Sequence, residues 1–222
     1  MVKKKYAGLL FTVWSIISLF AANVRAETVF STTFNKDGWS AGDWILAKNP
    51  ELSHFGGWVQ REDSIENETP SDKPGTTALE ETFTSMVYKK KVGGDIKVSS
   101  TVEYYGSSGP GMVFVSEMGK DKEGRPEYRE SFEIYIYDGG VNIWRHVFKN
   151  GKWSYIMTAS ANFTLKPKTR YKLEAEKKGK YFSVVIDGHR FGYLETSLPE
   201  EFYAGVVGCE GITRFYDFRI EK

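Results

Sequence analysis

The sequence contains a single cysteine, Cys209, in 222 residues. One thiol cannot form an intramolecular disulfide, and it excludes both a zinc site built on cysteines and a small disulfide-held scaffold. The chain also lacks an excess of charge, because 30 Lys and Arg side chains face 29 Asp and Glu side chains. Nucleic-acid-binding proteins carry a basic excess, so we expect no nucleic-acid partner.

Several sequence patterns of common enzymes are absent as well. The chain has no glycine-rich phosphate loop, no nucleophile elbow around a serine, and no metal-ligand spacing among its three histidines. A turn explains Asp138, Gly139 and Asn142 better than a calcium site does. We therefore predict no cofactor and no metal. Aromatic residues, in contrast, make up 15% of the chain, which favours a β-rich fold.

The first 26 residues have the layout of a secretory signal peptide. Lys3, Lys4 and Lys5 precede an apolar run from Tyr6 to Ala22, and Val24-Arg25-Ala26 supplies small residues before a cleavage point at Glu27. The alternative is an uncleaved membrane anchor over Ala7 to Val24, which is close to the shortest span that crosses a bilayer. We expect a secreted or periplasmic protein with no membrane contact after cleavage.

Residues 27–222 are expected to form one all-β domain. Apolar and polar side chains alternate with a period of two in three stretches, which is typical of half-buried antiparallel strands. These stretches are 96–103, 132–137 and 171–176. Asn150-Gly151 and Asp187-Gly188 predict tight hairpin turns between strands, and the polar segment 63–76 is expected to be a long surface loop. The fold class is an antiparallel β-sandwich.

The motifs in the last two-thirds of the chain resemble those of a known superfamily. The stretches that carry the resemblance are Gly109–Val115, Phe132–Asp138, Tyr171–Glu176, Phe182–Gly188, Ala204–Gly208 and Arg214–Ile220. They are similar to the concanavalin A-like lectin/glucanase superfamily, and most of all to its secreted keto-disaccharide hydrolase family of glycosyl hydrolases. The resemblance implies a concanavalin A-like jelly roll that acts on carbohydrate. The family usually places a glutamine and a histidine where this chain has Val207-Gly208-Cys209-Glu210.

The alternation also indicates a candidate site on one concave sheet face. If Phe132, Ile134 and Ile136 point into the core, the residues between them face solvent beside the next strand. Such a face offers flat apolar rings and polar groups, the mixture that binds sugars. The candidate substrate-binding residues are Tyr105, Glu117, Tyr135, Tyr137, Asn142 and Trp144. We expect Cys209 to be a small core residue.

Glycoside hydrolysis requires two carboxyl groups about 5 to 10 Å apart. Glu133 is the first catalytic candidate, and Glu103 or Glu117 is its expected partner. His146 is a candidate general base or sugar ligand. Solvated acids and cross-strand tyrosine contacts are the alternative explanation of the same pattern.

The sequence leaves three functions open. The first is an exported protein that binds an oligo- or polysaccharide and hydrolyses a glycosidic bond. The second is a non-catalytic carbohydrate-binding module, which the departures near Cys209 favour. The third is an adhesion sandwich that contacts protein partners. The sequence does not indicate the oligomeric state.

Overall fold

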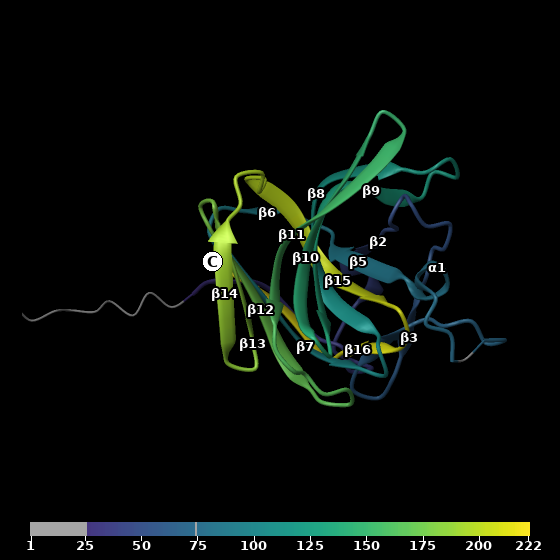
Figure 1. Ribbon diagram of the computed structural model, residues 1–222. Coiled ribbons are helices and arrows are strands. Elements are labelled where there is room, and N and C mark those ends of the chain that lie inside the picture. The colour runs from purple at the N-terminus through teal and green to yellow at the C-terminus, as the bar shows by residue number, and fades with distance from the viewer. Residues whose placement is uncertain (1–25, 74) are drawn as a thin grey trace, which may run out of the picture.

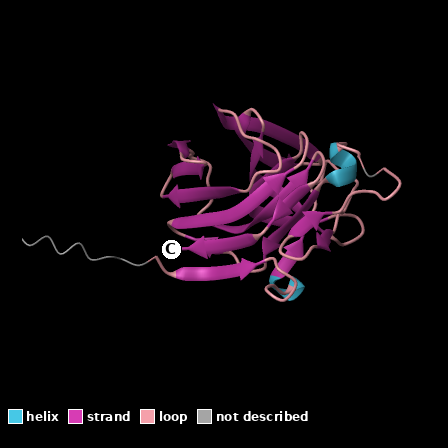
Figure 2. Cartoon of the chain, turned by 90° about the horizontal axis from the view of Figure 1, so that it is seen from below, coloured by secondary structure: helices cyan, strands magenta, loops and turns pink. Residues whose placement is uncertain are grey.

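A computed structural model describes residues 26–73 and 75–222 and shows two antiparallel β-sheets packed face to face (Figures 1 and 2). Helix within this part of the chain is limited to a 3₁₀ turn, Ala41–Asp43, and to α1, Leu79–Thr82. Neither helix is long and apolar enough to cross a membrane. The predicted signal peptide lies in residues 1–26, nearly all of it outside the described residues.

The first sheet, called sheet A here, has nine strands among the described residues. The strands of its main path are, in spatial order, β14 (His189–Leu194), β13 (Tyr181–Ile186), β12 (Tyr171–Lys178), β7 (Ile96–Tyr104), β16 (Thr213–Phe215), β4 (Ile65–Asn67) and β3 (Trp58–Gln60). β17 (Asp217–Glu221) also pairs with β7, and β1 (Thr28–Thr33) pairs with β17.

The second sheet, sheet B, carries the candidate site. Its strands are, in spatial order, β11 (Lys152–Asn162), β10 (Gly140–Lys149), β9 (Pro126–Tyr137), β8 (Gly109–Lys120), β15 (Glu201–Cys209), β5 (Thr84–Tyr88) and β2 (Trp44–Leu46). The short strand β6 (Val92–Gly93) pairs with β15. The prediction of an antiparallel β-sandwich is confirmed.

The predicted hairpin turns join neighbouring strands. Asn150 and Gly151, with φ angles of 54° and 71°, connect β10 to β11. Asp187 and Gly188, with φ angles of 47° and 77°, connect β13 to β14. Both central positions of such a two-residue turn require positive φ, which Asn, Asp and Gly tolerate at low cost.

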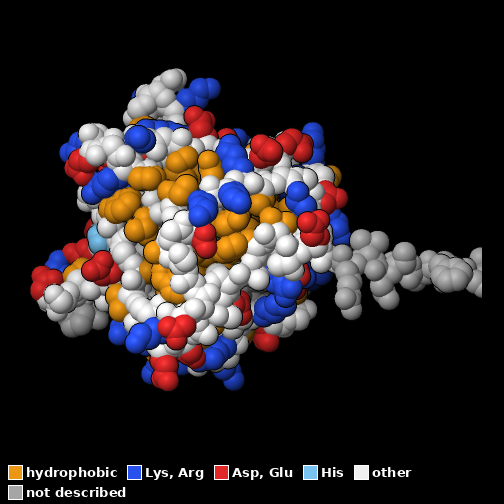
Figure 3. All heavy atoms as spheres, turned by 180° about the vertical axis from the view of Figure 1, so that it is seen from behind, with side chains coloured by type: hydrophobic (Ala, Val, Ile, Leu, Met, Phe, Trp, Pro, Cys, Tyr) orange, Lys and Arg blue, Asp and Glu red, His pale blue; other side chains and the backbone are white. Residues whose placement is uncertain are grey.

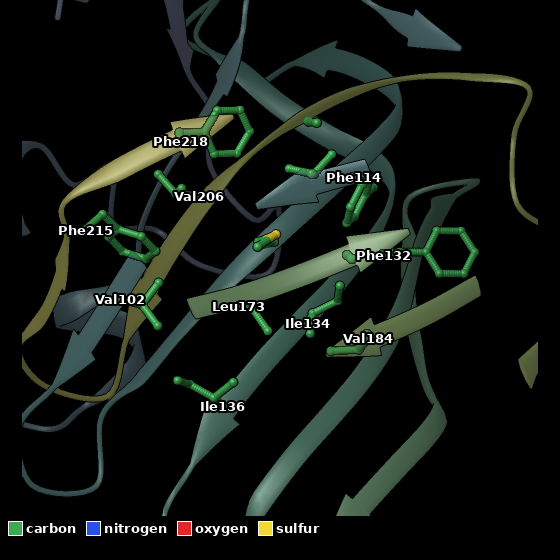
Figure 4. Packing of buried hydrophobic residues seen from close by; sticks show 14 of the residues in the cluster. Val102, Phe114, Phe132, Ile134, Ile136, Leu173, Val184, Val206, Phe215 and Phe218 are labelled. Carbon is green, nitrogen blue, oxygen red and sulfur yellow. The ribbon is translucent and has the colours of Figure 1, made fainter. Parts of the chain in front are cut away.

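The main hydrophobic core lies between the two sheets. Phe132, Ile134 and Ile136 of β9 are fully buried there, and they share the core with residues of sheet A such as Leu173 and Val184 (Figure 4). Because side chains alternate across a strand, the residues between them in β9 project from the outer face of sheet B. The sequence pattern therefore placed this strand with the correct face inward.

A second, smaller apolar cluster lies on the outer face of sheet B. It contains Val113, Val115 and Val207, and the residues next to them along the strands point into the main core. Ala47 and Leu52, from the chain after β2, pack against the same cluster. A strand that is buried on both faces reads as a continuous apolar run rather than an alternating one. This cluster explains the unbroken apolar stretches in β8 and β15, and it forms one side of a hollow on this face.

The predicted long loop over 63–76 is only partly a loop. Its first part contains β4, whose three residues are all buried. Asn67 is buried because its amide nitrogen donates to the carbonyl oxygens of Thr82 and Gly211, while its side-chain oxygen accepts from the backbone nitrogen of Thr213. Polar side chains whose hydrogen bonds are satisfied can be buried at little cost. The polar composition of 63–76 therefore did not indicate the strand β4.

The molecular surface carries charges of both signs, in agreement with the near-balanced composition. Seen from behind, apolar side chains gather in the middle of one face, and Lys, Arg, Asp and Glu side chains surround them (Figure 3).

Candidate functional site

A cavity of about 680 Å³ lies on the outer face of sheet B. Its wall includes side chains from β9, β10 and β11, from the end of β15, and from the chain that follows β2. This volume is within the range of about 300 to 1,000 Å³ that is usual for small-molecule sites.

Strand register brings the central residues together. Trp144 of β10 lies directly opposite Glu133 of β9, and Asn142 lies opposite Tyr135. On the other side of β10, His146 lies opposite Tyr155 of β11. Directly opposed residues on one face of an antiparallel pair have Cβ atoms about 5 Å apart. The side chains on this part of the sheet are therefore close enough to contact one ligand.

Glu133 is the most enclosed acid in the cavity wall, with a side chain that is only 1% exposed. The hydroxyl of Tyr135 donates to its Oε2 atom at 2.6 Å, and the hydroxyl of Ser131 donates to its Oε1 atom at 3.2 Å. The Nε2 atom of His146 lies 3.6 Å from the same Oε2 atom. Hydrogen bonds from neutral donors hold the carboxyl group in one orientation and compensate part of its desolvation.

Tyr135 lies on the floor of the cavity. Burial and the neighbouring Glu133 carboxyl raise the pKa of its hydroxyl well above the ordinary value, so the group stays protonated and remains a donor. Its ring packs against the strand β8 at Gly109 and Gly111, where a Cβ atom in place of hydrogen would come within 3.4 and 3.2 Å of the ring. A larger residue at Gly111 would also meet the carbonyl oxygen of Ile134, so glycine is needed for this close approach.

Aromatic rings form the opposite side of the cavity. The rings of Trp144 and Tyr155 meet edge to face with centroids 5.9 Å apart, and Tyr155 is 58% exposed. The His146 ring lies 6.1 Å from Tyr155 and 5.2 Å from Trp153. Both ring nitrogens of His146 are buried and have no hydrogen-bond partner among the described residues. The wall therefore presents flat apolar ring surface, and the unpaired nitrogens of His146 are enclosed within it.

Cys209 and Glu210 close the cavity at the end of β15. Cys209 is buried as predicted, but it belongs to the outer cluster rather than to the core between the sheets. Burial and the nearby carboxyls of Glu210 and Glu133 raise the pKa of its thiol well above the ordinary value, so it is not a reactive thiolate. Burial also raises the pKa of Glu210, since partial desolvation disfavours the ionised form.

The cavity contains a majority of the residues that the sequence indicated. The six that line it are Glu133, Tyr135, Tyr137, Asn142, Trp144 and His146. Their roles stay predictions, but the expectation that they share one face of one sheet is correct for these six.

The structure places the other three candidates elsewhere, so the expectation that they share this face is wrong. Glu103 and Tyr105 come from β7 and the residue after it, in sheet A, and therefore face the opposite side of the sandwich. There Glu103 accepts a hydrogen bond of 2.7 Å from Tyr216, and the guanidinium of Arg214 lies 4.6 Å from the Tyr105 ring centre. Alternation reveals which residues face outward, but it does not reveal to which sheet a strand belongs.

Glu117 is also outside the cavity. It is exposed on β8, where the pairing of β8 with β9 is irregular on both sides of this residue. A bulge changes the direction of the side chains that follow it, and the sequence carries no clear sign of this one.

Several cavity residues were missed by the sequence analysis. The ones that matter most are Glu51, Phe83, Tyr155 and Glu210. Tyr155 could have been predicted from the sequence, because the Asn150-Gly151 turn fixes which residue of β11 lies opposite His146. Glu51 could not, because the chain after β2 is placed by tertiary contacts such as the parallel bridge between Lys48 and Glu127.

No cluster of three or more His, Cys, Asp or Glu side chains suited to a metal ion occurs in residues 26–73 and 75–222. The carboxyls of the cavity are therefore distributed over its wall rather than directed at a single point.

Comparison with known structures identifies the fold class of this chain. A scan of protein-family models and a search of curated protein sequences gave no match. Among solved structures, the chain is similar to β-agarase A from Zobellia galactanivorans, with a TM-score of 0.64, 8% identity, and coverage of 89% of this chain and 92% of that one. The chain has the concanavalin A-like jelly-roll fold.

Two further similar structures are an enzyme and a binding module. A glycoside hydrolase family 16 endo-glucanase from Bacteroides ovatus has a TM-score of 0.58 at 11% identity, with 86% of this chain and 99% of that one covered. The carbohydrate-binding module CBM66 from Bacillus subtilis has a TM-score of 0.56 at 15% identity, with 81% and 96% covered. Identities this low establish a common fold, and the fold is shared by enzymes and by binding modules.

Proposed function

We propose that this protein binds an oligo- or polysaccharide in the cavity on sheet B and hydrolyses a glycosidic bond there. The observation that carries the proposal is the position of Glu133, a nearly inaccessible acid that lines the cavity directly opposite the aromatic ring of Trp144. The named functions of the similar structures support a carbohydrate ligand by analogy.

Binding follows from the chemistry of the wall. Trp144 and Tyr155 offer apolar surface to the faces of sugar rings. Asn142 offers polar atoms to hydroxyl groups. The nitrogens of His146 have no hydrogen-bond partner within the described part of the chain, but they are enclosed, so a contact with a sugar hydroxyl requires the imidazole ring to move. A few fixed polar groups in an otherwise apolar pocket set the orientation of a ligand.

Hydrolysis would use Glu133 as the base or nucleophile. The hydrogen bonds from Tyr135 and Ser131 hold its carboxyl group in place, and a carboxylate in this role must be fixed relative to the sugar. The second carboxyl cannot be Glu103, which lies on sheet A. Glu210 is the proposed acid, because it lines the same cavity and burial raises its pKa, which favours the protonated form.

The decisive experiment begins with a glycan array probed with residues 27–222. Oligosaccharides that bind are then incubated with the wild type, with Glu133→Gln, and with Glu103→Gln as the matched control on sheet A. We expect Glu133→Gln to lower turnover by about 10²- to 10⁴-fold and Glu103→Gln to leave it unchanged. Unchanged turnover in Glu133→Gln would remove the proposed catalytic role, and binding to no glycan would contradict the function as a whole.

A non-catalytic binding module is the second candidate. It is favoured by the stretch Val207-Gly208-Cys209-Glu210, because the secreted keto-disaccharide hydrolases usually carry a glutamine and a histidine in this strand. Glycan binding without product formation by the wild type would establish this candidate. Product formation from a disaccharide bearing a keto group would instead support the narrower resemblance to that family.

We also propose export from the cytoplasm. This proposal rests on the signal-peptide layout before Glu27. Amino-terminal sequencing of the protein recovered from the expressing cells tests it, and the expected first residue is Glu27. A chain that retains its first 26 residues would support the membrane-anchor alternative.

A further inference from the structure

The cavity wall is acidic, although the chain as a whole is almost neutral. Its lining contains the carboxyl groups of Glu51, Glu133, Asp138 and Glu210, and it contains no Lys or Arg side chain. With 30 basic and 29 acidic residues in the sequence, this imbalance is local to the cavity. Carboxyls that line one hollow with low-dielectric walls concentrate a negative potential inside it.

These four carboxyls also lack basic partners. None of them lies within 4.0 Å of a Lys or Arg nitrogen of the described residues, although Glu51, Asp138 and Glu210 are exposed and only Glu133 is buried. Acids elsewhere in the described chain do have such partners. Glu66, for example, has Arg61 at 2.6 Å and Arg214 at 2.7 Å. Partial desolvation raises the pKa of the Glu210 carboxyl, which has no basic group beside it among the described residues. A positively charged ligand would supply the partner that the protein does not.

The arrangement of the acids indicates an extended ligand rather than an ion. They come from four places in the chain, namely the segment after β2, the strand β9, the turn after β9, and the end of β15. No three of them converge in the manner of a metal site within the described residues. Separate carboxyls along a wall suit a molecule that carries several positive charges at intervals.

The remainder of the wall independently indicates a saccharide. The edge-to-face pair of Trp144 and Tyr155 presents apolar ring surface, and the two nitrogens of His146 are buried in the wall without hydrogen bonds to the described residues. Exposed ring surface of this kind is suited to the faces of sugar units, while a simple cation site would not require it.

We infer that the ligand of this cavity is an amine-bearing saccharide, a chain of hexosamine units whose protonated amino groups lie against Glu51, Asp138 and Glu210. The inference rests on the proposed saccharide-binding function and narrows it. Neutral sugars are expected to bind more weakly because they leave the carboxyls without a counter-charge. Sugars that bear carboxylate or sulfate groups are expected to be repelled.

The test is isothermal titration calorimetry of residues 27–222 with oligosaccharides of equal length. The four probes are oligomers of glucosamine, N-acetylglucosamine, glucose and galacturonic acid. At low ionic strength we expect the glucosamine oligomer to bind at least about tenfold more tightly than the glucose oligomer. We expect the galacturonic acid oligomer to bind most weakly, and we expect high salt to reduce the preference for glucosamine.

Variants identify the groups that recognise the amine. Glu210→Gln and Glu51→Gln are each expected to reduce the preference for glucosamine over glucose severalfold. The matched control is Glu201→Gln, which removes an exposed acid from the first position of β15, outside the cavity and at the far end of the strand that Glu210 follows. This change should leave the preference unaltered. Thermal melts of each variant verify that the fold is retained.

The outcomes separate the two levels of the proposal. Equal binding of the glucosamine, N-acetylglucosamine and glucose oligomers would overturn the inference and leave the saccharide function standing. Binding of none of the four would contradict both. An undiminished preference in both Glu210→Gln and Glu51→Gln would overturn the role of the carboxyls. A lysine oligomer is titrated as a fifth, sugar-free probe, and its binding as tightly as the glucosamine oligomer would overturn the requirement for a sugar.

Discussion

Replacing Tyr135 with phenylalanine removes the shorter of the two hydrogen bonds that reach Glu133. The Tyr135 hydroxyl donates to Oε2 at 2.6 Å, and the acceptor side chain is only 1% exposed, so water cannot easily replace the lost donor. Leaving a buried acceptor without its donor costs about 1 to 3 kcal/mol. Phenylalanine keeps the ring that packs on Gly109 and Gly111, so the hydroxyl is the main loss.

We therefore expect Tyr135→Phe to lower the free energy of unfolding by about 2 kcal/mol at neutral pH. For a domain of this size the melting temperature should fall by about 4 to 8 °C. Urea unfolding and differential scanning calorimetry measure both quantities. Tyr155→Phe is the control, since Tyr155 is 58% exposed and its hydroxyl has no hydrogen-bond partner among the described residues, and it should change stability by less than about 0.5 kcal/mol.

The difference in unfolding free energy between wild type and Tyr135→Phe is also expected to depend on pH in the alkaline range. The pKa of Tyr135 is raised well above its ordinary value of 10.0 in the folded protein. Above pH 10 the unfolded chain therefore loses this proton before the folded chain does, and the stabilisation from the raised pKa declines as the pH increases. The gap between wild type and Tyr135→Phe should narrow by up to about 1.4 kcal/mol per pH unit above 10. Equal stability at pH 8, or a gap that widens with pH, would refute the reasoning.

Two further substitutions test the binding wall and the core. Trp144→Ala should weaken binding of any sugar that the protein recognises by at least about tenfold, because it removes the ring opposite Glu133. Tyr181→Ala, on sheet A, is the control and should leave the affinity unchanged. Titration calorimetry measures the affinity of both variants. Ile134→Ala should lower the free energy of unfolding by about 2 to 5 kcal/mol, because Ile134 is fully buried between the sheets. Val185→Ala, at a half-buried position, should cost clearly less in urea unfolding, and equal costs would contradict the assignment of the core.

The sequence allowed prediction of those features that depend on local pattern. The alternation in β9 gave the correct inward face, and the Asn150-Gly151 turn gave the β10–β11 hairpin. As a result, the acid and the ring at the centre of the cavity, Glu133 and Trp144, were identified together. These features follow from the period of two in a strand and from the φ angles that a tight turn requires.

Features set by tertiary contacts were not predictable in the same way. Glu103 has the same outward phase as Glu133 but belongs to the opposite sheet, and phase carries no information about sheet membership. The strand around Asn67 was concealed by polar side chains whose partners are distant in the sequence. Glu51 reaches the cavity on a segment that has no regular structure, so no periodicity marks it.

The central claim is that the hollow on the outer face of sheet B holds a saccharide. A crystal structure of residues 27–222 with the tightest-binding oligosaccharide tests this claim most directly. The account predicts a sugar ring against Trp144 or Tyr155, with a hydroxyl or amino group within hydrogen-bonding distance of the Glu133 carboxyl. A sugar bound to the outer face of sheet A, beside Glu103 and Tyr216, would contradict it.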